Sequence, residues 1–167
     1  HGNGPQVGAL LIQQERAAKE VPPQTMDIVG AMTQGQIGYM IQQELQNLLR
    51  KNGMGHVPVV TVVNQVRVDK NDPEFKGDRA SKPVGPFYTK EEAEKIAQER
   101  GYLVKEVKPG VERGWRRVVP SPIPVENMEA QAIKIMLDNR IVVIASGGGG
   151  IPVYYEEEGV LKGIAAV

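Results

Sequence analysis

The feature that most constrains the fold is a run of four glycines directly after a short apolar segment. Residues 141–145, Ile-Val-Val-Ile-Ala, are expected to form a buried strand, and Ser146 and then Gly147, Gly148, Gly149 and Gly150 follow it. Glycine contributes no side chain to packing and is entropically expensive to order. We interpret the run as a loop whose backbone N–H groups face an anion. The alternative is a flexible linker, which the apolar residues on either side disfavour.

A second glycine-containing turn opens the chain, in the sequence His1-Gly2-Asn3-Gly4-Pro5. Gly2 and Gly4 permit a close approach of a ligand to the main chain, and Pro5 suits the first position of a helix. Asn3 can cap that helix or bind a ligand. Unpaired N–H groups at a helix N-terminus attract anions. An anion site and an ordinary glycine turn before a helix fit this spacing equally well.

Hydrophobic periodicity predicts a chain that alternates helices and strands. The main helices are expected over residues 5–19, 26–51 and 126–139. Strands are expected over residues 57–68 and 141–145, and over 153–155 and 160–164, which would pair across an acidic turn. This order predicts an α/β fold with a mainly parallel sheet. Both glycine segments would then lie at the carboxyl edge of the sheet, where such folds bind ligands.

Residues 69–120, called the arm below, differ in composition from the segments on either side. Residues 69–88 are rich in proline and charge and predict a loop. A capping box formed by Thr89 and Glu92 predicts a short helix that ends near Arg100. Residues 102–107 and 115–119 predict a hairpin, in which Arg116 and Arg117 are expected to be solvated or to make a dimer or lid contact. We therefore expect a small protruding α+β insertion over 69–120, and a core domain formed by 1–68 and 121–167.

The charge balance and residue usage exclude several classes of function. Twenty Lys and Arg residues balance twenty Asp and Glu residues, so no bulk charge points to nucleic acid or an anionic membrane. The absence of cysteine and the presence of only two histidines argue against thiolate or histidine-rich metal centres. No apolar run approaches the roughly 20 residues that span a bilayer. We expect no nucleic acid or membrane partner, no metal ligands in the chain, and a cytoplasmic location.

Neither glycine segment matches a common nucleotide-binding signature. A Walker A loop is absent, because no Lys-Ser or Lys-Thr follows the glycines. The spacing of Gly2, Gly4 and Gly8 is a weak variant of the dinucleotide fingerprint, with Pro5 inside the turn and no acidic residue at the required distance. The two segments therefore fit phosphate or carboxylate binding better than hydride chemistry.

Six segments, in order along the chain, carry a resemblance to a known family. They are residues 1–8 (HGNGPQVG), 31–35 (AMTQG), 72–75 (DPEF), 81–88 (SKPVGPFY), 114–122 (GWRRVVPSP) and 147–152 (GGGGIP). Together they resemble carbamate kinase, a member of the amino-acid-kinase superfamily. The resemblance covers essentially the whole chain.

The resemblance implies a fold, a reaction and a set of site residues. The fold would be a three-layer αβα sandwich, as a homodimer. The reaction would be reversible phosphoryl transfer between ATP and carbamate, giving ADP and carbamoyl phosphate, with Mg²⁺. Gly2, Asn3, Gly4 and Pro5 would line the carbamate side, and the loop from Gly147 to Gly150, with Gly148 and Gly149 between them, would border the same site. Lys82 would be catalytic and reach the transferred phosphate; a solvated loop lysine is the alternative.

Two parts of the family pattern are not found within these 167 residues. A Gly-Gly-Asn-Ala loop should precede His1, and an Ile-Asp-Lys-Asp segment with a further catalytic lysine should follow Val167, ahead of the nucleotide-binding half. We therefore expect the chain to be an internal piece of a longer protein. A non-catalytic anion-binding fragment is the alternative to an active kinase.

Overall fold

The longest element is the helix α2, Met26–Lys51, whose bounds match the helix predicted over residues 26–51. The computed structural model describes all 167 residues. Its other helices are α1 (Gly4–Ala17), α3 (Lys90–Arg100) and α4 (Ala130–Asp138). Gly38 of α2 faces the strand β1 (Val59–Thr61), and a Cβ there would overlap the side chain of Thr61. Close packing of helix on strand therefore explains this glycine. None of the helices has the length and apolar character that a bilayer crossing demands.

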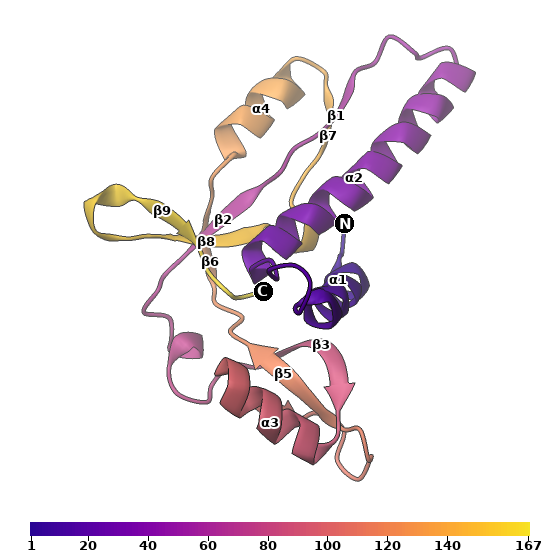
Figure 1. Ribbon diagram of the computed structural model, residues 1–167. Helices are drawn as coiled ribbons and strands as arrows, with labels where there is room; N and C mark the ends of the chain where they lie inside the picture. The colour runs from indigo at the N-terminus through magenta and orange to yellow at the C-terminus, as the bar shows by residue number, and fades with distance from the viewer.

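Nine strands form three separate sheets (Figure 1). Besides β1 they are β2 (Gln65–Val68), β3 (Lys82–Tyr88), β4 (Val104–Glu106), β5 (Trp115–Val119), β6 (Pro124–Asn127), β7 (Val142–Ile144), β8 (Ile151–Tyr155) and β9 (Leu161–Gly163). The sheets have the orders β1-β7, β6-β2-β8-β9 and β3-β5-β4. The pairs β1·β7 and β2·β8 are parallel, as expected, and the other four are antiparallel. The expected mainly parallel sheet is thus not found in this chain, because β6 and β9 add antiparallel neighbours.

Two predicted elements of the core are divided differently in the structure. The strand expected over 57–68 is interrupted between β1 and β2, which belong to different sheets. The helix expected from residue 126 begins at Ala130, because residues 124–127 pair with β2 as the edge strand β6. An ion pair between Glu126 and Arg67, 3.0 Å from Oε2 to Nε, accompanies this pairing. The polar start of the predicted helix is therefore strand.

The first part of the arm contains a strand that proline content concealed. Residues 82–88 form β3 and not a loop, and Lys82 pairs with Val119 of β5. The ladder is irregular between Val84 and Tyr88, where Gly85 has a φ of +71°. This irregularity accommodates Pro86, since proline cannot donate to a sheet ladder and is tolerated at bulges. Pro83 pairs with Val118 in the regular part of the ladder, and β3 is an edge strand, where proline is also tolerated.

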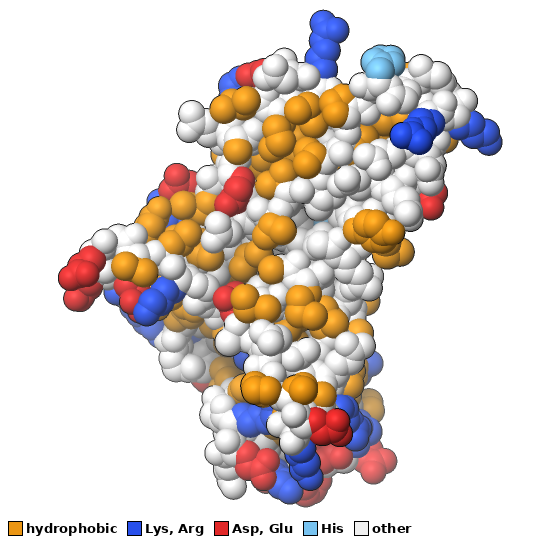
Figure 2. Space-filling view, turned by 45° about the horizontal axis from the view of Figure 1, so that its top comes forward, with side chains coloured by type: hydrophobic (Ala, Val, Ile, Leu, Met, Phe, Trp, Pro, Cys, Tyr) orange, Lys and Arg blue, Asp and Glu red, His pale blue; other side chains and the backbone are white.

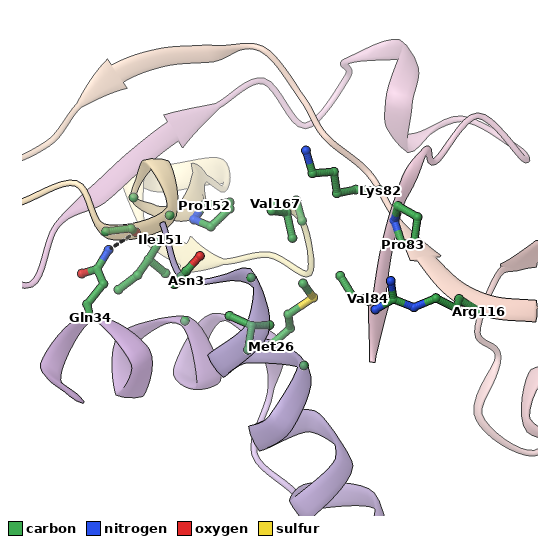
Figure 3. Close-up of a pocket in the computed structure, with 18 residues that line it drawn as sticks. Asn3, Met26, Gln34, Lys82, Pro83, Val84, Arg116, Ile151, Pro152 and Val167 are labelled. Atoms are coloured by element: carbon green, nitrogen blue, oxygen red, sulfur yellow. Dashed lines mark hydrogen bonds between the residues drawn. The ribbon is translucent and has the colours of Figure 1, made fainter. Parts of the chain in front are cut away.

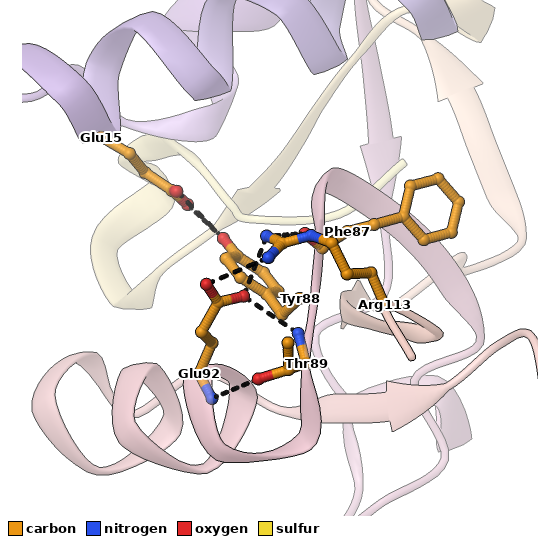
Figure 4. Close-up of polar contacts among 6 residues, drawn as sticks. All are labelled: Glu15, Phe87, Tyr88, Thr89, Glu92 and Arg113. Carbon is orange, nitrogen blue, oxygen red and sulfur yellow. Dashed lines mark hydrogen bonds and ion pairs between the residues drawn. The ribbon is translucent and has the colours of Figure 1, made fainter. Parts of the chain in front are cut away.

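The remainder of the arm follows the prediction closely. Thr89 and Glu92 form the expected capping box at the start of α3, and Gly101 ends the helix in the left-handed conformation. β4 and β5 pair as the expected antiparallel hairpin. Arg113 reaches back from the hairpin to the Glu92 carboxylate, with Nη2 2.8 Å from Oε2 (Figure 4). The helix and the sheet of the arm are thus joined by charged contacts.

The arm and the core share one buried apolar cluster. It combines residues of α1 and α2 with Val84 of β3 and Val119 of β5: Val7, Leu11, Met26, Val29, Val84 and Val119. In Figure 1, α1 lies between α2 and β3, and packs on both. The division into domains 1–68 with 121–167 and 69–120 stays a prediction, and the shared cluster shows that the arm rests on α1.

Much apolar surface remains exposed. Hydrophobic side chains form several groups on the face shown in Figure 2. The exposed large hydrophobic residues include Tyr39, Met40 and Leu48 of α2 and Ile135 and Leu137 of α4. Only 24 of the 167 residues are buried, so the core is small for a chain of this length.

Candidate functional site

A cavity of about 110 Å³ lies where α1, α2, β3 and the start of β8 meet (Figure 3). It is small beside the roughly 300–1,000 Å³ of pockets for drug-sized ligands. Its lining includes six of the nine predicted site residues: Asn3, Gly4, Lys82, Gly147, Gly148 and Gly150. Gly2, Pro5 and Gly149 do not line it. Segments separated by most of the chain length therefore converge on one small site.

The charged residues that line the cavity are all cations. They are Lys82 and Arg116, and no Asp or Glu is among the lining residues. Neither takes part in any of the six ion pairs of the chain. Lys82 is the first residue of β3, and Figure 3 shows its side chain extended over the cavity. Two positive charges without a countercharge favour an anionic ligand.

The side chain of Arg116 is held in place by the neighbouring strand β3. The sequence had predicted a solvated side chain or a dimer or lid contact. Its Nη2 and Nε donate to the carbonyl oxygen of Gly85, at 2.7 and 3.2 Å. Its guanidinium carbon lies 4.9 Å from the centroid of the Phe87 ring, a cation–π contact. Burial lowers the pKa of Arg116 from its ordinary value, but arginine stays protonated at neutral pH. The neighbouring Arg117 is likewise partly buried, and stacks on Tyr102 at 3.8 Å.

The N-terminal turn places a helix end at the cavity. Asn3 stands at the N-cap position of α1, but its side chain does not cap the helix. Instead its Nδ2 donates to Thr33 Oγ1 of α2 at 3.0 Å. The N–H groups of Gly4 and Gln6 lie in the first turn, where a helix offers them no acceptor. The interpretation as an anion site therefore keeps its physical basis at this turn.

The glycine run has a different role from the one that its sequence suggested. The N–H groups of Gly148, Gly149 and Gly150 donate within the chain, to the carbonyls of His1, Ser146 and Gly147 at 2.9, 3.0 and 3.2 Å. They are therefore not directed at an anion. The argument that these glycines do not serve packing was wrong.

Packing and backbone conformation account for the glycines. A Cβ at Gly147 would overlap the ring of His1, and one at Gly148 would overlap the side chain of Asn3. Gly148, Gly149 and Gly150 have φ of +65°, +93° and +109°, a region that L side chains rarely adopt. The run thus lets one loop lie directly against the other at the cavity.

A buried polar network holds the glycine run through hydrogen bonds to Ser146 and Gly147. Asn64, fully buried between β1 and β2, accepts a hydrogen bond from Ser146 Oγ at 2.8 Å and donates from Nδ2 to Glu129 Oε2 at 2.7 Å. It also exchanges side-chain hydrogen bonds with Asn127 at 2.8 and 3.1 Å. Gln34 of α2 lines the cavity and bonds both Asn64 and Gly147. Of these residues only Gly147 was predicted from the sequence, although a glutamine on the apolar face of α2 was a usable signal.

Comparison with known proteins gives consistent results for the whole chain. No family model matches the sequence. The chain is 54% identical to the carbamate kinase of Pyrococcus furiosus and 56% identical to that of Thermococcus kodakarensis. Both matches cover all of this chain, and they cover 52% of the first protein and 51% of the second. Among solved structures, carbamate kinase from Giardia lamblia bound to AMP-PNP matches with a TM-score of 0.87 and 44% identity, over 99% of this chain and 51% of that one.

These relatives agree with the resemblance seen in the six sequence segments. The match in structure extends to the arm as well as the core, since nearly every residue is covered. The chain spans about half the length of the curated relatives that it matches. Along its entire length the chain is therefore homologous to carbamate kinases.

Proposed function

We propose that this chain forms the carbamate side of a carbamate kinase, which transfers a phosphoryl group reversibly between ATP and carbamate. The observation that carries the proposal is the small cavity in which Lys82 and Arg116 meet the N-terminus of α1 with no Asp or Glu side chain in the lining. Carbamate and carbamoyl phosphate are small anions that match this charge. The homology to carbamate kinases supports the same substrate class.

In the proposed reaction the chain positions and neutralises charge. A carbamate oxygen forms a bond to the γ-phosphorus of ATP while the bond from phosphorus to the ADP oxygen breaks. Carbamate is already an anionic nucleophile, so no residue needs to act as a general base. Lys82, extended over the cavity, is the catalytic residue that meets the charge of the transferring phosphoryl group. Asn3, Gly4, Gly147, Gly148 and Gly150 form the walls on the carbamate side. Gly2, Pro5 and Gly149 belong to the same two segments without lining the cavity.

The nucleotide and Mg²⁺ are assigned no residue of this chain. The chain spans about half the length of the carbamate kinases that it matches. We infer that ATP or ADP with Mg²⁺ is bound mainly by residues outside these 167. The complete enzyme would be a cytoplasmic homodimer with a three-layer αβα sandwich, from which residues 69–120 protrude as a lid.

The reverse reaction gives the clearest test. ADP and carbamoyl phosphate are added to the natural polypeptide that contains these residues, and ATP formation is followed by luminescence. We expect ATP only when both substrates are present. If the protein binds phosphate or carbamoyl phosphate but forms no ATP, the result would instead favour the non-catalytic anion-binding fragment. Intact mass of the same sample shows whether these 167 residues act alone, since they account for 18.3 kDa.

A further inference from the structure

Two adjacent residues in the middle of α2 each contact a different wall of the cavity. Thr33 and Gln34 have exposed fractions of 0% and 1%. A buried helix face normally carries apolar side chains, because burying a polar group costs free energy unless it is hydrogen-bonded. Here both polar side chains are hydrogen-bonded, and each has one partner in a loop that lines the site: Asn3 for Thr33 and Gly147 for Gln34.

Thr33 holds the N-terminal turn. Its Oγ1 accepts a hydrogen bond from Asn3 Nδ2 at 3.0 Å and donates to the carbonyl of Gly30, one turn earlier in α2, at 2.7 Å. The hydroxyl is therefore oriented by the helix and presents its lone pair to Asn3. This contact explains why Asn3 does not cap α1.

Gln34 holds the glycine loop. Its Nε2 donates to the carbonyls of Gly147 and Asn64, at 3.0 and 3.1 Å, and its Oε1 accepts from the Asn64 N–H at 2.8 Å. The amide thus completes the backbone hydrogen bonding of Asn64 in the gap between β1 and β2. It also fixes Gly147, 113 residues away in sequence, against α2.

The two loops also touch each other directly. The N–H of Gly148 donates to the carbonyl of His1 at 2.9 Å, and Gly148 packs against Asn3 so closely that a Cβ would overlap it. Each of the two loops is also anchored separately to α2, through Asn3 and through Gly147. Hydrogen bonds are directional, so two anchors on consecutive residues fix the spacing between the loops more narrowly than apolar packing would.

We propose that Thr33 and Gln34 are positioning residues that set the N-terminal turn and the glycine loop at the spacing that carbamoyl phosphate binding requires. The inference rests on the proposed function for its substrate, but the positioning itself is a property of the fold. Neither residue takes part in the chemical step. Their effect passes through Asn3 on one wall and Gly147 on the other.

The test compares two substitutions of Thr33 in the natural polypeptide that contains this chain. Thr33→Val removes the hydroxyl and keeps the branched shape, whereas Thr33→Ser keeps the hydroxyl. The matched control is Thr61→Val, because Thr61 Oγ1 is buried without any hydrogen-bond partner and Thr61 does not line the cavity. Two quantities are measured: amide hydrogen exchange at Gly148, and the KM values for carbamoyl phosphate and ADP.

Loss of one net hydrogen bond changes an equilibrium by about 5- to 10-fold. Thr33→Val is therefore expected to raise the KM for carbamoyl phosphate and the Gly148 exchange rate by about that factor, with the KM for ADP unchanged. Thr33→Ser should keep the KM for carbamoyl phosphate and the Gly148 exchange rate near the wild-type values, and Thr61→Val should match the wild type in both. Gln34→Glu replaces the donor to Gly147 with an oxygen and should raise the exchange rate at Gly148 above that of the wild type.

Several outcomes would overturn the inference. Unchanged exchange and unchanged KM in Thr33→Val would do so, as would an equal effect of Thr33→Val, Thr33→Ser and Thr61→Val. A wild-type protein that forms no ATP would overturn the proposed function. The exchange rate at Gly148 would then decide the positioning role by itself.

Discussion

The hydroxyl of Tyr88 in β3 donates a hydrogen bond to the carboxylate of Glu15 in α1, with its oxygen 2.8 Å from Oε1 and 2.9 Å from Oε2 (Figure 4). Tyr88 is buried at the end of the strand that begins with Lys82. The contact joins the arm to the helix whose N-terminus lines the cavity. It is the polar counterpart of the apolar cluster that Val84 and Val119 share with α1 and α2.

Tyr88→Phe should therefore weaken the attachment of the arm. Removal of this hydroxyl is expected to lower the free energy of unfolding by about 1 kcal/mol at pH 7. Burial first, and then the bond to Glu15, raise the pKa of Tyr88 above its ordinary value of 10.0. Above pH 10 the unfolded chain loses the proton that the folded protein retains, so stability should fall as pH rises there.

Denaturant unfolding at pH 7 and at pH 10.5 checks both effects. The fall in stability between the two values should be smaller in Tyr88→Phe than in the wild type. Tyr39→Phe is the matched control, because Tyr39 is 62% exposed and has no carboxylate partner. Equal alkaline slopes in wild type and Tyr88→Phe would contradict the assignment.

Glu129 should contribute to the loss of stability at acid pH. Burial opposes its ionisation, but hydrogen bonds from the backbone and side chain of Gln65 and from Asn64 outweigh it and lower its pKa below 4.5. A carboxyl whose pKa is lowered by folding stabilises above its unfolded pKa, and this stability is lost as pH falls through the folded value. The Glu129→Gln variant should therefore be less stable than the wild type at pH 7. Its free energy of unfolding should also fall less than that of the wild type on acidification.

Unfolding midpoints measured between pH 7 and pH 3 test this prediction. Glu126→Gln serves as the control, because its ion pair with Arg67 lies at the surface, where such pairs contribute little. Parallel curves for the wild type and Glu129→Gln would show that the network around Asn64 does not depend on the charge.

The parts of the fold that local signals encode were predictable from the sequence. The periodicity of α2, the capping box of Thr89 and Glu92 and the β4·β5 hairpin depend on residues close together in the chain, and all three are confirmed. The strand β3 was missed because its prolines indicate a loop. Its pairing with β5 is a contact between segments more than 25 residues apart, which local composition does not report.

The site was predictable only in part, for a similar reason. The resemblance supplied nine residues, and the structure brings six of them to one cavity: Asn3, Gly4, Lys82, Gly147, Gly148 and Gly150. Gln34 and Asn64 were missed because their hydrogen bonds connect segments 30 to 113 residues apart. The local argument for the glycine N–H groups was wrong because their acceptors are the carbonyls of Ser146, Gly147 and His1, and the contact with His1 is visible only after folding.

Lys82→Ala is expected to slow ATP formation about 100- to 1,000-fold, the range for removing one electrostatic contact from a closed site. The fold should be unaffected, because the Lys82 side chain is exposed and makes no ion pair. Lys82→Arg should rescue poorly, since a planar guanidinium does not replace a compact ammonium. Steady-state kinetics of both Lys82 variants test this role. Lys76→Ala serves as the control, because Lys76 is an exposed lysine of the same arm. A rate for Lys82→Ala within about threefold of wild type would show that Lys82 is only a solvated lysine on β3.

Gly4→Ala separates ligand contact from folding at the N-terminal turn. No atom of the chain lies within 4 Å of a Cβ built on Gly4, so the fold has room for it. We expect an unchanged unfolding midpoint and weaker use of carbamoyl phosphate, because the added methyl group would meet the ligand. Gly148→Ala should differ by also losing stability, since its φ is +65° and its Cβ would overlap Asn3. Full activity in Gly4→Ala would remove this turn from the binding site.

Arg116 and Arg117 provide the sharpest comparison, because they are neighbours on β5 with different surroundings. Arg116 lines the cavity with Lys82, whereas Arg117 stacks on Tyr102 and lines a separate hollow. Arg116→Met should raise the KM for carbamoyl phosphate about 10-fold or more, the effect of losing one charged hydrogen bond. Arg117→Met should leave that KM near the wild-type value and lower the unfolding midpoint instead.

The comparison also separates binding from support of the strand. Arg116→Lys keeps the positive charge but loses the two donors to the Gly85 carbonyl. If the charge binds the anion, Arg116→Lys should retain most of the affinity, and rising salt should reduce the difference from Arg116→Met. If Arg116 serves only to hold the irregular part of β3, Arg116→Lys and Arg116→Met should raise the KM for carbamoyl phosphate equally at every salt concentration. KM values for carbamoyl phosphate measured at low and high ionic strength distinguish the two roles.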